Sequence, residues 1–194
     1  MDIGQGAGLA GATGVRPYLP PLLAGALARG DTGVDFEGTA YEFLEEPAFL
    51  VAVLGLAVVA YWLDRTRGTR PDEGRDPVAL VLGAIGLALG ALLCAGSWAD
   101  GEESSAWIGL LVGAGCAALG YLAIGGLFAR ARRRLRGEGG GNLLDAYADV
   151  GALVLAGLSI LFPPLGFAAI AAFLFLLARS RGGGDKYEGL RILR

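Results

Sequence analysis

The sequence predicts an all-α fold, a polytopic transmembrane helix bundle of about six spans, and three observations support this prediction. Apolar runs such as 49–63 and 78–97 have no polar face, whereas a helix of a water-soluble domain keeps one face polar. Glycine supplies 34 of the 194 residues, and small residues let the backbones of membrane helices approach closely. Arginine is concentrated in alternate loops between the runs. We therefore interpret residues 1–182 as one transmembrane helical domain and residues 183–194 as a cytoplasmic tail.

Proline interrupts the first apolar segment, which covers about residues 3–28. Arg16 is followed by Pro17 and then by the pair Pro20-Pro21, and proline removes a backbone donor and clashes with the preceding helical turn. Two topologies fit this segment: one broken span, or a re-entrant hairpin that turns at Pro20-Pro21. We favour the broken span, because about 26 residues are too few for two full crossings.

The remaining spans follow from the apolar runs and from a second proline pair. The last apolar region, 143–178, is too long for one helix and contains Pro163-Pro164. A Pro-Pro pair stops a helix, so we expect two spans joined by a tight turn. The predicted spans after the first segment are 47–63, 78–98, 106–129, Leu143–Phe162 and Leu165–Ser180.

Arginine counts predict the orientation. Loops 64–77 and 130–142 and the tail carry arginines, whereas loop 99–105 has no basic residue and the stretch 29–46 is acidic. Short loops rich in Lys and Arg stay in the cytoplasm, so we place the three arginine-rich segments inside and the other two outside. The C-terminus is then cytoplasmic, with the protein in the plasma (inner) membrane.

The composition gives little support to an enzyme. Histidine, the commonest general base and metal ligand, is absent. Cys94 and Cys116 lie inside apolar runs, and we interpret them as small buried hydrophobic residues. The run Arg130 to Arg136, beside a membrane helix, is interpreted as a topology signal that touches anionic lipid. We expect no catalysis, no metal, no cofactor and no nucleic-acid partner, with membrane lipids as the expected partners.

Two glycine pairs have the spacing of close helix packing. They are Gly86 with Gly90 and Gly109 with Gly113. We interpret both pairs as contacts within the chain, and a homodimer stays open as an alternative.

Arg16 is the first candidate for a binding role. Ionisable residues within a membrane usually face the bundle interior or a water-filled cavity. The prolines around Arg16 predict irregular backbone, which is tolerated at membrane depth only where protein or water satisfies its polar groups. With Tyr18 beside it, Arg16 would anchor an anionic group such as a lipid phosphate or a carboxylate. The alternatives are a structural ion pair and a side chain that extends to the interface.

Asp145 and Asp149 are the second candidates. Their spacing of four residues places them on one face of a helix. Two carboxylates on one face could bind a cation, relay protons or pair with Arg16. The alternative is an amphipathic first turn, since acids are favoured near the amino terminus of a helix.

The stretch Gly14-Val15-Arg16-Pro17-Tyr18-Leu19-Pro20, after a Gly- and Ala-rich start, resembles bacterial membrane proteins of the family called domain of unknown function 4126. The resemblance implies a Gly-x-Arg-x-aromatic motif followed by proline, acids late in the second span, and a Gly-Asn element before an acidic helix with a later proline. The residues that match these later features are Asp64, Gly141, Asn142, Asp149 and Pro163.

The sequence departs from the family pattern at three positions. Gly55 stands near a frequent Glu, Leu143 replaces the usual Pro after Asn142, and Ala148 replaces an acid. The resemblance therefore implies a bacterial membrane fold, and the family has no established activity to carry over.

Together these features favour a small carrier, or a lipid- or ion-handling protein, with a polar pocket lined by Arg16 and Asp149. Proline-broken apolar segments in both halves of a chain are a pointer to transporter sites. The alternative is a non-transporting scaffold or accessory subunit whose buried charges are structural. A carrier should hold Arg16 and Asp149 around a hydrated cavity, whereas a scaffold should pair them directly.

Overall fold

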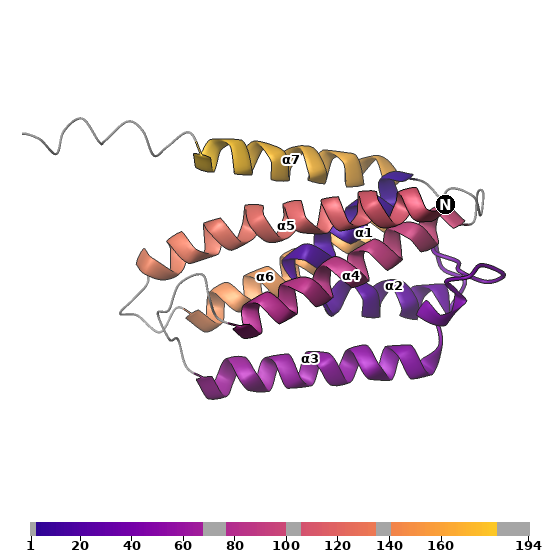
Figure 1. Cartoon of the computed structure of the whole chain (residues 1–194), viewed down its shortest axis with the longest axis horizontal. Coiled ribbons are helices and arrows are strands. Elements are labelled where there is room, and N and C mark those ends of the chain that lie inside the picture. The colour runs from indigo at the N-terminus through magenta and orange to yellow at the C-terminus, as the bar shows by residue number, and fades with distance from the viewer. Residues whose placement is uncertain (1–2, 68–76, 100–105, 135–140, 182–194) are drawn as a thin grey trace, which may run out of the picture.

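The computed structural model of the chain describes residues 3–67, 77–99, 106–134 and 141–181. This part of the chain forms seven α-helices and one short 3-10 helix, η1, which agrees with the all-α prediction (Figure 1). The predicted tail 183–194 lies outside the described residues. The elements are α1 Ile3–Val15, α2 Leu19–Ala28, η1 Glu42–Leu44, α3 Pro47–Arg67, α4 Pro77–Ala99, α5 Ala106–Arg134, α6 Gly141–Leu161 and α7 Pro163–Arg181.

Helices α3 to α7 run back and forth along the long axis of the bundle (Figure 1). α3, α5 and α7 end at the same side, and their last residues are Arg67, Arg134 and Arg181. We call this side the arginine-rich end, and we call the opposite side, which holds residues 29–46, the acidic end. The helices from residue 47 onward thus coincide with the spans that hydropathy predicts.

The described helices are long and apolar enough for a membrane. Four of them, within α4, α5, α6 and α7, contain apolar stretches of 18 to 23 residues, and α3 adds the shorter apolar stretch Pro47–Leu63. About 20 apolar residues cross the hydrocarbon core of a bilayer. The chain is therefore a multi-span membrane protein.

Large apolar side chains face outward in this bundle. Val51, Trp107, Leu111 and Phe175 are each more than 60% exposed, whereas much of the buried core is alanine. A water-soluble domain buries its large apolar residues instead. An outer surface of large aliphatic and aromatic side chains suits contact with lipid, since lipid tails are as apolar as leucine.

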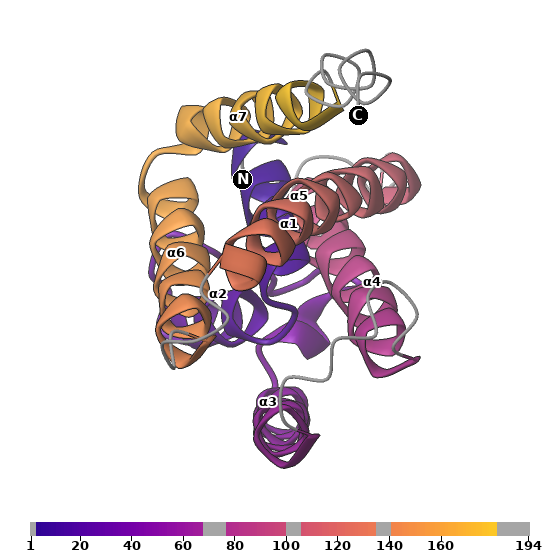
Figure 2. The same ribbon diagram turned by 90° about the vertical axis from the view of Figure 1, so that its left-hand side faces the viewer.

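Helix α1 forms the centre of the bundle. Every residue from Gly4 to Gly14 is buried, and α1 packs against α2, α4, α5, α6 and α7 (Figure 2). Glycine makes this packing close. A Cβ atom at Gly120 of α5 would overlap the carbonyl oxygen of Gly11, and one at Gly166 of α7 would overlap that of Gly4. These contacts bring backbone against backbone, which a larger residue would prevent.

The predicted glycine pairs are contacts within the chain. A Cβ atom at Gly90 would lie 2.8 Å from the Ala117 side chain, and one at Gly113 would lie 2.7 Å from the carbonyl oxygen of Gly90. Nearby, Cys94 and Cys116 are both free and buried. They share an apolar cluster with small residues of α1, as the sequence predicts.

The first segment is a re-entrant hairpin, so the favoured prediction of one broken span is wrong. α1 runs from the acidic end into the bundle, and α2 returns to the acidic end (Figure 1). The Gln5 amide Nε2 donates a hydrogen bond of 2.7 Å to the carbonyl oxygen of Gly33, which joins the start of α1 to the residues after α2. At 1.5 Å per residue, α1 reaches about 20 Å, less than the roughly 30 Å of a bilayer core.

The hairpin turns at residues 16–18 and not at Pro20-Pro21. Both of these prolines lie in the first turn of α2, where backbone N–H groups have no partner within the helix. Pro163 and Pro164 likewise begin α7, and Phe162 alone separates α6 from α7. The predicted tight turn between the last two spans is confirmed.

Residues 29–46 cover the hairpin at the acidic end. Phe36 and Leu44 are fully buried here and belong to the core cluster that includes Leu9. The backbone N–H of Phe36 donates to Glu45 Oε1 at 3.2 Å. Burial raises the pKa of Glu45 above its ordinary value of 4.5, and the bond from Phe36 opposes this rise while neighbouring acids add to it.

The close contact of α1 with α5 predicts different effects of the same substitution at two glycines of α5. Gly120→Ala should lower thermal stability, because the new methyl meets the Gly11 carbonyl and overpacking costs about 1–3 kcal/mol. Gly125→Ala on the same helix faces open space and should be neutral or raise stability by up to about 1 kcal/mol. Midpoints of unfolding in mild detergent measure both effects, and equal midpoints would contradict the packing described above.

The raised pKa of Glu45 predicts a pH-dependent gain from Glu45→Gln. The folded state binds the Glu45 proton more tightly than the unfolded state, so this stabilisation is lost as the pH rises above the ordinary value of 4.5. The glutamine amide oxygen keeps the acceptor for Phe36. The variant should therefore gain more in Tm at about pH 7 than at about pH 4. Glu46→Gln, at an exposed neighbour, is the control, and a gain that does not grow with pH would refute the assignment.

Candidate functional site

The hairpin turn positions Arg16. Its backbone N–H still donates to the carbonyl oxygen of Ala12 at 3.1 Å, so Arg16 continues the last turn of α1. Pro17 follows and has no N–H to continue the helix. Gly86 of α4 makes room for this turn, because a Cβ atom there would lie 3.2 Å from the Pro17 Cβ. The chain thus bends against α4 and directs Arg16 to another helix.

Arg16 contacts two carboxylates of α6. Its Nη2 atom donates to Asp145 Oδ1 and to the Asp145 carbonyl oxygen, each at 3.1 Å. Its Nε atom lies 2.7 Å from Asp149 Oδ1. We call these three residues the Arg16 cluster. One guanidinium and two carboxylates give it a formal charge of −1.

The acids of the cluster are more exposed than the arginine. The side chain of Arg16 is 15% exposed, against 34% for Asp145 and 40% for Asp149. Ion pairs in a low-dielectric interior need further hydrogen bonds to offset their desolvation. The Asp145 carbonyl oxygen supplies one such bond to the guanidinium.

The cluster lies toward the arginine-rich end. The apolar part of α6 begins at Leu144, so Asp145 is at its edge and Asp149 is about 6 Å deeper. The hairpin enters from the acidic end and therefore reaches across most of the bundle. Its tip is held by acids near the opposite side.

The structure joins three of the four residues predicted for binding. Arg16, Asp145 and Asp149 form the cluster, which realises the predicted pairing of the two acids with Arg16. Tyr18 lies two residues beyond Arg16 at the N-cap position of α2, and its carbonyl oxygen accepts the N–H of Leu22 at 3.3 Å. Tyr18 is therefore part of the hairpin turn.

The two proline breaks lie in different places. Pro17, Pro20 and Pro21 belong to the hairpin, at the cluster or beside it. Pro163 is the first residue of α7, and its carbonyl oxygen lies against Gly4 near the start of α1. Pro164 follows it in α7. The breaks do not form one site, although each permits a change of chain direction.

One structural residue escaped the sequence analysis. Gln5 is 3% exposed and closes the hairpin through Gly33. Gln5 could have been recognised in the sequence because it is an amide side chain in an otherwise apolar Gly- and Ala-rich run. The hydroxyls of Thr13, Ser97 and Ser159, by contrast, donate to carbonyl oxygens of their own helices.

Some residues carried by the family resemblance lie outside the described side chains. They are Asp64 of α3 and Gly141 and Asn142 at the start of α6. Ala148, which replaces an acid of the family pattern, is buried beside Asp149. In the part of the chain that the structure describes, no three residues among His, Cys, Asp and Glu gather to hold a metal ion.

Of the comparisons with known proteins, the one with protein families finds a match. A sequence model of the family described as domain of unknown function (DUF4126) matches residues 3–182. No curated protein and no solved structure matches the chain.

The contacts of the Arg16 cluster predict energetic coupling between Arg16 and Asp149. Arg16→Met should lower the free energy of unfolding by about 2 kcal/mol, because a hydrogen bond to a charged group contributes about 1.5–3 kcal/mol. Asp149→Asn should cost less, since Asp145 still pairs with Arg16. The double variant should be less destabilised than the sum of the two, with a coupling of about 0.5–3 kcal/mol. Denaturation in detergent provides the measurement, and strictly additive losses would show that the contact has no energetic weight.

Proposed function

The chain belongs to the family described as domain of unknown function (DUF4126), and we propose that this member is a small carrier whose Arg16 cluster handles a cation. The family description assigns no activity. The proposal therefore rests on the charge, exposure and position of the cluster.

The sign of the ligand follows from which groups are accessible. Arg16 is mostly covered and already contacts both acids, so an anionic ligand would be repelled by two carboxylates beside the guanidinium. The carboxylates are at least one-third exposed and carry one negative charge in excess. A proton or a small cation can add to them directly. This favours the predicted cation or proton role of the acids over the predicted anionic anchor at Arg16.

Binding at Asp149 would also act on the hairpin. A cation on the exposed part of the Asp149 carboxylate competes with the Arg16 guanidinium for the same negative charge, while the buried Oδ1 lies 2.7 Å from Arg16 Nε. A ligand shifts a conformational equilibrium by its differential affinity for the two states. Loading the acid therefore weakens the contact that holds the hairpin tip, and this couples ligand binding to movement of α1 and α2.

The proposed orientation places the arginine-rich end in the cytoplasm of a bacterial or archaeal plasma membrane. Short loops rich in Arg stay inside, and the C-terminus is then cytoplasmic. The hairpin enters from outside without crossing, so α3 to α7 make five crossings. The predicted six included the first segment as a span.

A non-transporting scaffold is the second candidate, and the direct pairing of Arg16 with both acids favours it, since this pairing is the arrangement expected of a scaffold and not of a carrier. In this case the ion pairs only hold the hairpin in place, and the protein serves as an accessory subunit or a homodimer. For neither candidate do we propose catalysis, a resident metal cofactor or a nucleic-acid partner.

Reconstitution into vesicles distinguishes the two candidates. Protein is sealed into liposomes with a dye for H⁺, Na⁺ or K⁺, and uptake of each ion is followed after an imposed gradient. Asp149→Asn should lower the rate of uptake of the transported ion about tenfold or more. The reason is that the ion loses its contact with a charged carboxylate, and a contact to a charged group contributes about 1.5–3 kcal/mol.

Asp31→Asn is the matched control, because Asp31 is an exposed acid at the acidic end with a left-handed backbone that Asn also adopts. It should transport like the unmodified protein. Uptake no faster than in empty liposomes for all three ions would exclude the carrier and leave the scaffold.

A further inference from the structure

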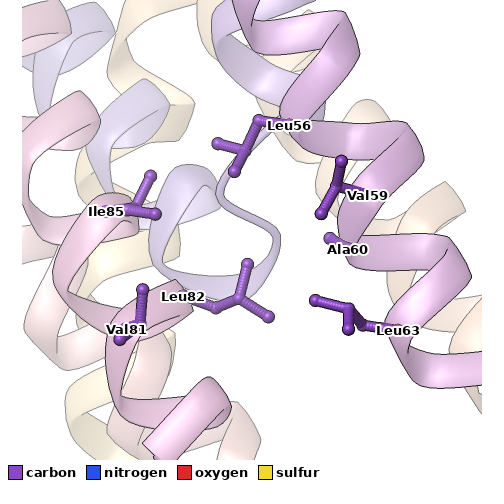
Figure 3. Close-up of a pocket in the computed structure, with 7 residues that line it drawn as sticks. All are labelled: Leu56, Val59, Ala60, Leu63, Val81, Leu82 and Ile85. Atoms are coloured by element: carbon purple, nitrogen blue, oxygen red, sulfur yellow. The ribbon is translucent and has the colours of Figure 1, made fainter.

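A groove between α3 and α4 is lined only by aliphatic side chains. Four of them come from α3 and three from α4, and they face one another across a space of about 200 Å³ (Figure 3). Leu63 and Val81 lie at one end of the groove, and Leu56 and Ile85 lie at the other. The lining offers no polar group to a ligand.

The groove exists because α3 stands apart from the bundle. α3 packs against α2 and η1, and the end-on view shows it separated from the other helices (Figure 2). Groove residues remain open to the surroundings, with Val59 and Val81 more than half exposed. At this depth of a membrane protein the surroundings are hydrocarbon. Water is a poor occupant, since a buried water needs polar partners.

The depth of the groove matches the upper part of a lipid tail. Leu63 is nearest the arginine-rich end, and its neighbour Trp62 is 62% exposed. Indole rings favour the membrane–water interface. From Leu63 to Leu56 the helix rises about 10 Å. The groove therefore begins near the interface and extends into the hydrocarbon along the direction of an acyl chain.

The sequence beyond the groove has charges that suit a phosphate. Helix α3 continues past Leu63 for one more turn, which includes Arg65 and Arg67. Arginine is well suited to phosphate recognition. Every glycerophospholipid carries a phosphate above its acyl chains, and the sequence places these two arginines in the helical turn that follows the groove.

We propose that the groove binds one acyl chain of a phospholipid from the leaflet at the arginine-rich end. The space suits a single linear chain. The inner end of the groove lies at Ile85, next to Gly86, which packs against Pro17 of the hairpin turn. The bound chain is thus a neighbour of the turn that carries Arg16.

Two adjacent valines provide a matched test. Val59 lines the groove, whereas Val58 is exposed beside it and is not among the lining residues. Protein purified in mild detergent is equilibrated with vesicles of phosphatidylglycerol and phosphatidylethanolamine, and native mass spectrometry counts the phospholipids retained. Val59→Phe should retain at least about fivefold less, equivalent to about 1 kcal/mol, because the larger ring occupies the space of the acyl chain. Val58→Phe should retain one phospholipid, as the unmodified chain does.

Unfolding midpoints show whether each variant is folded, and Val81→Leu, at a groove residue that is 58% exposed, fills the groove with a smaller change if Val59→Phe is unstable. Three outcomes would overturn the proposal: no lipid on the unmodified chain, equal retention by the folded Val58 and Val59 variants, or a dimer that Val59→Phe alone dissociates. The last outcome would make a second copy the occupant.

Discussion

The contact of the α1 backbone with α5 and α7 is the constraint on which the other features depend. A helix with large side chains could not lie at the centre of five others, and α1 does so because Gly11 meets Gly120 and Gly4 meets Gly166. This packing supports a helix that ends inside the bundle. The polar groups at its end then need partners within the protein, because hydrocarbon supplies none.

The Arg16 cluster supplies those partners and links the fold to the proposed function. An arginine at the tip of a re-entrant hairpin is costly to bury unless opposite charges meet it. Asp145 and Asp149 do so from α6, near the end of the bundle opposite to the one where the hairpin enters. The contact that stabilises the tip is therefore also the contact that a cation would disturb. The inner end of the lipid groove is at Ile85, next in sequence to Gly86, which packs against the same hairpin turn.

The sequence predicted the helices from residue 47 onward because hydropathy depends on the chain itself. A run such as 78–98 is apolar on all sides, and only a helix satisfies its backbone within lipid. The Pro163-Pro164 turn was predictable for a similarly local reason. The hairpin was not, because the length argument assumed that each arm must cross the bilayer. α2 has only 10 residues, and it is stable because the residues around Phe36 and Leu44 cover its returning end.

The sequence by itself determined an all-α membrane protein, the bounds of its later spans, and three residues whose charges require an explanation. Local rules of hydropathy, proline geometry and helix periodicity suffice for these features. The tertiary structure alone decided that Arg16 pairs with both Asp145 and Asp149 and that Gln5 closes the hairpin through Gly33. Arg16 and Asp145 are 129 positions apart. Their meeting depends on how α1 packs among its neighbours, and no local pattern encodes that arrangement.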